Sequence, residues 1–156
     1  MRISILTVGH KAPAWIQEGF NEYARRMPPE ARVELVELKP EERAAGRSTT
    51  RAKELEGERI LAALPPGATL IALDERGKAV TTQGLSVMLA DWMRDGSHPA
   101  FAIGGADGLS DAVRARAQKL VSLSALTLPH AMVRVVLAEQ LYRAWSILAR
   151  HPYHRE

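Results

Sequence analysis

Short apolar runs rich in strand-forming residues alternate with segments of helical period along the whole chain. The strands are expected at 3–8, 33–38, 68–73 and 100–103, and the helices from Pro13 onward and at 52–64, 82–94, 110–119 and 129–149. Strands that alternate with helices favour an α/β fold, in which helices flank a mostly parallel sheet. The strand 33–38 alternates apolar and charged residues imperfectly, which indicates a place near the edge of that sheet.

The length and composition of the chain limit its class. Its 156 residues suit one domain that spans residues 1–156. Cysteine is absent, which excludes disulfides, thiolate nucleophiles and cysteine-based zinc sites and fits a reducing compartment. No apolar stretch approaches the roughly 20 residues of a membrane span, and the N-terminus is typical of a first strand rather than a signal peptide. We therefore expect a cytoplasmic protein that does not contact membranes.

The charge and the polar residues permit several partners. A net charge of +3 and a pI near 9.5 are compatible with an RNA partner but do not require one. No set of His, Asp and Glu residues has metal-ligand spacing, so no metal is expected. The charge-rich segment 40–59 is expected to form a loop and then a helix whose charged face is solvated, rather than an RNA contact, because its acidic residues balance its basic ones.

Three strand ends are candidate ligand sites. In open parallel sheets, ligands bind beyond the carboxyl ends of the strands. This rule selects the chain after Leu73, the chain after Ile103, and the stretch 123–128. All three are expected to meet at one edge of the sheet.

The second of these strand ends is the glycine-rich turn IGGADGLS at 103–110. Glycine allows positive φ angles and close approach of a ligand to the backbone, and Ser110 is suited to cap the following helix. The glycine spacing matches neither the dinucleotide fingerprint nor the P-loop. A tight strand-to-helix turn and a ligand cradle both remain open.

The third, the stretch 123–128, is apolar and precedes Pro129. Proline disfavours helix at the residue before it, so this stretch is expected to be extended or looped, and its apolar side chains predict burial. Buried backbone groups need hydrogen-bond partners. Strand neighbours would supply them, and so would the edge of a flat heteroaromatic ligand packed between leucines.

The last helix carries an apolar stripe that is broader than one domain core needs, which indicates a subunit interface. The stripe comprises Met132, Val133, Val136, Leu137, Leu141, Trp145 and Leu148, widened by Val135, Tyr142 and Ile147. Glu139 and Arg143 stand four positions apart and are expected to form an ion pair on the helix surface. Arg134 is suited either to another ion pair or to a phosphate.

The C-terminal tail combines cationic side chains with an aromatic ring. Its members are Arg150, His151, Tyr153, His154 and Arg155. Such a mixture suits an unpaired nucleotide, although a disordered basic tail has the same composition. His130, beside Pro129, is either a structural residue or a functional one.

Three of these segments occur together in one known family. The chain resembles the ribosomal RNA large subunit methyltransferase H family of the SPOUT superfamily, on the stretch 120–147, the turn 103–110 and the ending HPYHRE at 151–156. The similarity covers the whole chain, and the variable positions fall mainly at 41–59.

The resemblance implies an enzyme that uses S-adenosyl-L-methionine to methylate N3 of a pseudouridine in 23S ribosomal RNA. It also implies action on assembled ribosomes, a homodimer, and a C-terminal trefoil knot that holds the cofactor. Knots are almost absent from proteins, and the periodicity of this chain does not predict one. A non-catalytic ribosome- or RNA-binding factor with the same fold is the alternative, and a small-nucleotide sensor is a weaker one.

The resemblance also assigns residues. The family's cofactor positions fall on Leu73, Gly104, Leu123, Ser124, Ala125, Leu126, Thr127 and Leu128. Leu73 and Leu126 are expected to pack on adenine, and Gly104 to make room for the cofactor. In our hypothesis the tail closes over the partner subunit's cofactor. The candidate catalytic residues are His154 or Glu156 as proton acceptor, Arg155 and Arg143 for charge, Tyr153 for stacking, and His130 as a second-choice base.

Overall fold

The computed structural model describes residues 1–43, 46 and 48–155. Within these residues, five strands form one sheet in the order β2-β1-β4-β3-β5, and every neighbouring pair is parallel. The strands are β1 (Arg2–Val8), β2 (Arg32–Leu38), β3 (Thr69–Ala79), β4 (Pro99–Ile103) and β5 (Lys119–Ser122). The predicted parallel α/β fold is confirmed, and β2 lies at an edge as expected. The trefoil knot stays a prediction from the family resemblance.

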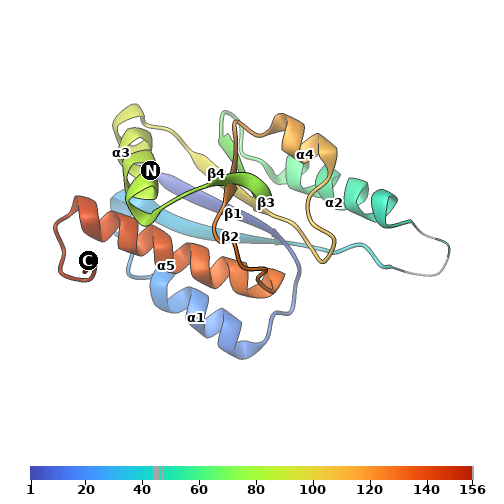
Figure 1. The fold of residues 1–156 in the computed structure, drawn as a ribbon, viewed down its shortest axis with the longest axis horizontal. Coiled ribbons are helices and arrows are strands. Elements are labelled where there is room, and N and C mark those ends of the chain that lie inside the picture. The colour runs from blue at the N-terminus through green and yellow to red at the C-terminus, as the bar shows by residue number, and fades with distance from the viewer. Residues whose placement is uncertain (44–45, 47, 156) are drawn as a thin grey trace.

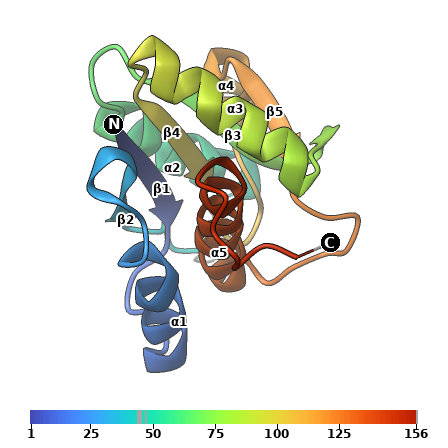
Figure 2. The same cartoon turned by 90° about the vertical axis from the view of Figure 1, so that its left-hand side faces the viewer.

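Helices cover both faces of the sheet (Figures 1 and 2). One face carries α1 (Ala14–Ala24), α3 (Thr82–Asp95) and α5 (His130–Leu148), and the other carries α2 (Thr49–Ala63) and α4 (Asp111–Arg116). A short 3-10 helix, η1 (Pro29–Ala31), precedes β2. Over the described residues, each helix is too short or too polar to cross a bilayer.

The strand residues alternate between two apolar layers. Ile3 and Ile5 of β1 pack toward α1, α3 and α5, whereas Leu6 and Val8 pack toward α2 and α4. Successive side chains of a strand point to opposite faces, so a strand covered on both faces is apolar throughout. This explains why residues 3–8 are all buried and read as a nearly continuous apolar run.

Two predicted boundaries are wrong for a physical reason. The helix that Ser110 caps ends at Arg116, not near Lys119, because Gln118 pairs with β3: its N–H donates to the Leu70 oxygen at 2.9 Å and its Oε1 accepts from the Leu70 N–H at 2.7 Å. Strand β3 continues past Leu73, with a register shift against β5 between Leu73 and Lys78. Gly77 permits this, because a Cβ there would lie 2.6 Å from the backbone of β5.

Candidate functional site

A pocket of about 740 Å³ lies at the carboxyl ends of β3, β4 and β5. Its volume is within the range of small-molecule sites. All three strand ends selected from the sequence contribute to it. Most of the residues predicted to bind the cofactor line the pocket, namely Leu73, Gly104, Leu123, Ser124, Leu126, Thr127 and Leu128. Ala125 is exposed and is not among the lining residues.

The stretch 123–128 forms one wall of the pocket without strand neighbours. Strand β5 ends at Ser122 and α5 begins at His130, and between them residues 123–128 form no backbone–backbone hydrogen bond within the described part of the chain. The Leu126 N–H instead donates to Ser124 Oγ at 2.9 Å. The predicted burial is wrong for Leu126, whose surface is 75% exposed. An exposed apolar side chain next to peptide groups that have no backbone partner fits a flat, partly apolar ligand.

The glycine turn forms a second wall, and its shape requires glycine. A Cβ on Gly104 would stand 2.5 Å from the carbonyl carbon of Gly108. Gly108 has φ +85° and donates its N–H to the Gly105 oxygen at 3.1 Å. Gly104 is therefore required by the turn itself, and its expected role of making room for a cofactor stays a prediction.

A polar wall completes the pocket, and the sequence reasoning missed it. Asp74 Oδ1 accepts the Arg76 N–H at 2.8 Å, and Arg114 Nη1 lies 3.3 Å from Asp74 Oδ2. Burial alone would raise the pKa of Asp74, but the Arg76 N–H and the two guanidinium groups lower it below its usual value. The carboxylate is therefore ionised at neutral pH. The sequence feature that could have indicated this polar wall is Asp74, an acidic residue directly after the apolar run 68–73.

The start of α5 borders the pocket. His130 is exposed and lines it. Arg134, one turn later, is only 2% exposed, and its Nη1 pairs with Glu37 Oε2 of β2 at 2.9 Å. The Arg134 Nη2 lies 3.6 Å from the position that a Cβ of Gly9 would occupy. Arg134 is therefore a buried cation that pairs with a partly exposed carboxylate at the sheet edge; the sequence alone had left open whether its partner is an ion pair or a phosphate.

The tail packs against the other end of α5. The Tyr153 ring lies 4.6 Å from the Tyr142 ring, and the Arg143 guanidinium lies 4.8 Å from the Tyr153 centroid. The Tyr153 hydroxyl donates to Glu139 Oε1 at 3.1 Å. Burial and the Glu139 charge raise the pKa of Tyr153 to about 12. The predicted pair of Glu139 and Arg143 is confirmed, at 2.7 Å, and Tyr153 is folded onto the helix rather than disordered.

The two groups of candidate residues do not meet within one chain. His130 and Arg143 are 13 positions apart on α5, which corresponds to about 20 Å along a helix. His154 is half-buried in the tail and Arg155 is exposed, whereas Glu156 lies outside the described residues. Among the residues described, no cluster of three His, Asp or Glu side chains is arranged to hold a metal ion.

A parallel α/β sheet with a ligand-sized pocket beyond its strand ends is typical of a protein that binds a small molecule. The family described as "Predicted SPOUT methyltransferase" matches residues 1–154. The fold is similar to the crystal structure of a probable methyltransferase from Bordetella pertussis Tohama I, with a TM-score of 0.59 and 16% identity over 92% of this chain and 95% of that one. The class is therefore that of the SPOUT methyltransferases.

Relatives that match the full length of the chain identify its family within this class. The ribosomal RNA large subunit methyltransferase H of Ralstonia pickettii is 59% identical over 155 residues, which is 99% of each chain. The protein of the same name from Burkholderia multivorans is 58% identical over the same share. The chain belongs to the ribosomal RNA large subunit methyltransferase H family of SPOUT methyltransferases, which confirms the resemblance seen in its sequence.

Proposed function

We propose that the protein is a methyltransferase that transfers the methyl group of S-adenosyl-L-methionine to N3 of a pseudouridine in 23S ribosomal RNA. The proposal is supported by the full-length relatives, which are named as ribosomal RNA methyltransferases. The observation that carries it is the pocket, because residues 73, 104, 123, 124 and 126–128 lie around one cavity. The choice of base and atom and the assembled ribosome as substrate follow from the resemblance, and the cytoplasm is the location expected from the sequence pattern.

The pocket fits the proposed methyl donor. The exposed Leu126 and the half-buried Leu73 offer apolar surface to adenine, and the unpaired peptide groups of 123–128 offer hydrogen bonds to its edge. When bound, the donor supplies a methyl group already activated on a sulfonium, so the protein mainly has to orient the reactants.

The acceptor side requires a base and a cation. N3 of pseudouridine carries a weakly acidic proton, and a base within hydrogen-bond reach assists its removal. His154 or Glu156 accepts that proton, Arg155 and Arg143 stabilise the resulting anion, and Tyr153 stacks on the base. His130, at the edge of the pocket, remains the second-choice base.

These roles require two copies of the chain. His130 at the pocket and Arg143 under the tail are 13 positions apart on α5, about 20 Å along the helix. A homodimer in which each tail reaches the pocket of the other subunit brings them together. The apolar side chains that α5 leaves partly exposed, such as Leu148 and Ile147, provide surface for that contact.

Binding and transfer measurements separate the enzyme from a non-catalytic ribosome-binding factor. We expect calorimetry to show binding of S-adenosyl-L-methionine, and labelled methyl to appear in 23S RNA of ribosomes that lack the modification. Because a small, mildly basic protein cannot read a long RNA alone, transfer should be strong on ribosomes, weak on free RNA and salt-dependent. Ribosome binding without donor binding would instead support the non-catalytic factor.

A further inference from the structure

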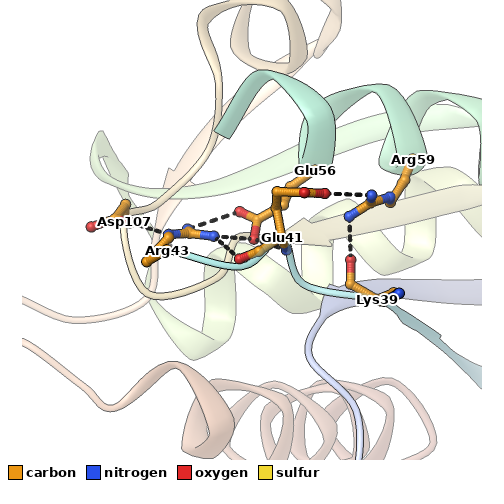
Figure 3. Close-up of polar contacts among 6 residues, drawn as sticks. All are labelled: Lys39, Glu41, Arg43, Glu56, Arg59 and Asp107. Atoms are coloured by element: carbon orange, nitrogen blue, oxygen red, sulfur yellow. Dashed lines mark hydrogen bonds and ion pairs between the residues drawn. The ribbon is translucent and has the colours of Figure 1, made fainter. Parts of the chain in front are cut away.

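Arg43, in the segment between β2 and α2, joins three parts of the molecule (Figure 3). Its Nε donates to Asp107 Oδ2 of the glycine turn at 2.8 Å. Its Nη1 and Nη2 donate to the two oxygens of Glu56 on α2 at 2.8 and 3.2 Å. Hydrogen bonds to Glu56 and then to Asp107 raise the pKa of Arg43 above its usual value. One guanidinium therefore connects a loop, a helix and a wall of the pocket.

Glu56 is buried, contrary to the solvated face predicted for this segment. Its surface is 1% exposed, and its Oε2 also accepts the Glu41 N–H at 2.9 Å. A Cβ on Gly105 would stand 3.4 Å from Glu56 Oε1, so the carboxylate lies directly against the turn. A buried ion pair adds little stability compared with apolar residues of similar size. Stability of the fold alone therefore does not require a charge here.

The glycine turn has few contacts that fix its conformation from within. Three of its residues, 104, 105 and 108, are glycines, which restrict the backbone least. The turn is closed by one hydrogen bond, from the Gly108 N–H to the Gly105 oxygen, within a single isolated bridge. Contacts from outside are thus needed to hold the turn in one shape.

We propose that Arg43 and Glu56 are positioning residues that hold the glycine turn, residues 104–108, in the shape that the methyl-donor pocket requires. Glu56 supports the turn at Gly105, and Arg43 holds it at Asp107. Neither side chain is among the residues that line the pocket, whereas the five residues of the turn all line it. In this inference, the identity of the ligand rests on the proposed function. The effect of Arg43 and Glu56 on the conformation of the turn does not.

Arg59 provides a matched control within the same cluster (Figure 3). Its Nη2 donates to Glu41 Oε2 at 2.6 Å and its Nη1 to the Lys39 oxygen at 2.9 Å. It therefore fastens the same segment to the same helix, and its side chain is about as exposed as that of Arg43, at 35% against 31%. Unlike the acceptors of Arg43, both of these acceptors lie outside the glycine turn.

The test compares Arg43→Ala with Arg59→Ala in the full-length protein. By calorimetry, Arg43→Ala should bind S-adenosyl-L-methionine roughly tenfold more weakly, because a small misplacement of a pocket wall lowers affinity. Arg59→Ala should stay within about twofold of the wild type. Hydrogen exchange of residues 103–110 without donor should be faster only in Arg43→Ala. On ribosomes, Arg43→Ala should raise KM for the donor while kcat at saturating donor changes little.

Conservative variants separate positioning from folding. Arg43→Lys keeps the charge but loses the fork that contacts two carboxylates, so its affinity should lie between those of the wild type and Arg43→Ala. Asp107→Asn weakens the contact between Arg43 and the turn and leaves the pair with Glu56, so it tests the role even if Arg43→Ala unfolds. Because Asp107 also lines the pocket, the deciding measurement for this variant is hydrogen exchange of the turn without donor. Equal exchange and equal affinity in the Arg43, Asp107 and Arg59 variants would overturn the inference. Faster exchange of the turn in a protein that does not bind the donor would overturn the proposed function alone.

Discussion

The two ends of α5 differ in how many of their hydrogen-bonding groups find partners within the chain. At the N-terminal end, the stretch 123–128 leaves backbone groups unpaired and exposes Leu126. At the C-terminal end, Glu139 accepts from Arg143 and Tyr153, and the tyrosine ring packs on the helix. The first end is open to solvent, whereas the second end packs on itself.

This difference is the basis for the separate roles that we propose for the two ends, donor binding at the first and catalysis at the second. Unpaired peptide groups and apolar surface provide affinity for a flat ligand, but they do not move protons. The tail carries titratable and cationic side chains, and within the same chain its Tyr153 packs on Glu139 and Tyr142, which do not line the pocket. If both ends serve one reaction, changes at the pocket should alter donor affinity, and changes at the tail should alter turnover.

The largest expected effect is the loss of the tail's chemistry. His154→Ala combined with Arg155→Ala should lower single-turnover methylation of ribosomes by roughly 10²–10⁴-fold, because a positioned base and a cation near the developing anion are removed. Donor affinity by calorimetry should change less than about threefold. A matched change of the exposed Arg150 to Ala provides the control. Turnover that survives the double change would remove the tail from the reaction.

A mixed dimer tests whether the tail serves the other subunit. One chain carries the double tail change, and the other carries Leu126→Asp, which damages the pocket rim. The heterodimer is purified by two different tags. If the tail acts within its own chain, no complete site remains. If the tail acts across the dimer, the intact pocket of the first chain faces the intact tail of the second chain, and one complete site remains. Roughly half of the wild-type rate is then expected, since one of two equivalent sites is complete. Activity as low as that of the two parent dimers would place both ends in the same chain.

The pocket end should show the opposite behaviour at Leu126. Leu126→Ala removes a side chain that is 75% exposed, so the free energy of unfolding should change by less than about 0.5 kcal/mol. Donor affinity should nevertheless fall roughly tenfold, because apolar contact with adenine is lost. Val87→Ala, at 61% exposed on α3, is the control that should alter neither quantity. Unchanged donor affinity in Leu126→Ala would mean that this leucine does not cover the ligand.

Much of the fold was predictable because the residue patterns that indicate most strands and helices involve residues close together in the sequence. The apolar run of β1, the helical spacing of Leu85 and Leu89, and the Ser110 cap each depend on neighbours in sequence. The errors occurred where distant segments decide. Gln118 ends α4 by pairing with Leu70, and Gly77 lets β3 approach the backbone of β5 closely where their register shifts. Neither contact is visible in a local sequence pattern.

For the site, too, the position was predictable from the sequence, but the contacts between distant residues were not. The strand-end rule selected three segments, and they surround one pocket because carboxyl ends of parallel strands meet at one edge. The partners of the charged residues were not predictable. Glu56 was expected in solvent, since a charge-rich segment carries no local sign that Arg43 folds back over it and reaches Asp107. Burial of a charge is decided by tertiary contacts.

The smallest expected effect concerns the closed end of α5. In the folded state the pKa of Tyr153 is about 12, above the value of about 10 for an unfolded chain. The neutral phenol therefore stabilises the fold fully below pH 10, and this contribution is lost as the pH rises to 12. Tyr153→Phe removes the hydrogen bond to Glu139 and should cost about 1 kcal/mol at pH 8. Urea unfolding at pH 8 to 12 should show the wild type and variant converging, because only the wild type loses this stabilisation. If the two stability curves stay parallel, the hydroxyl does not bind Glu139 in solution, and the tail is less closed than its contacts indicate.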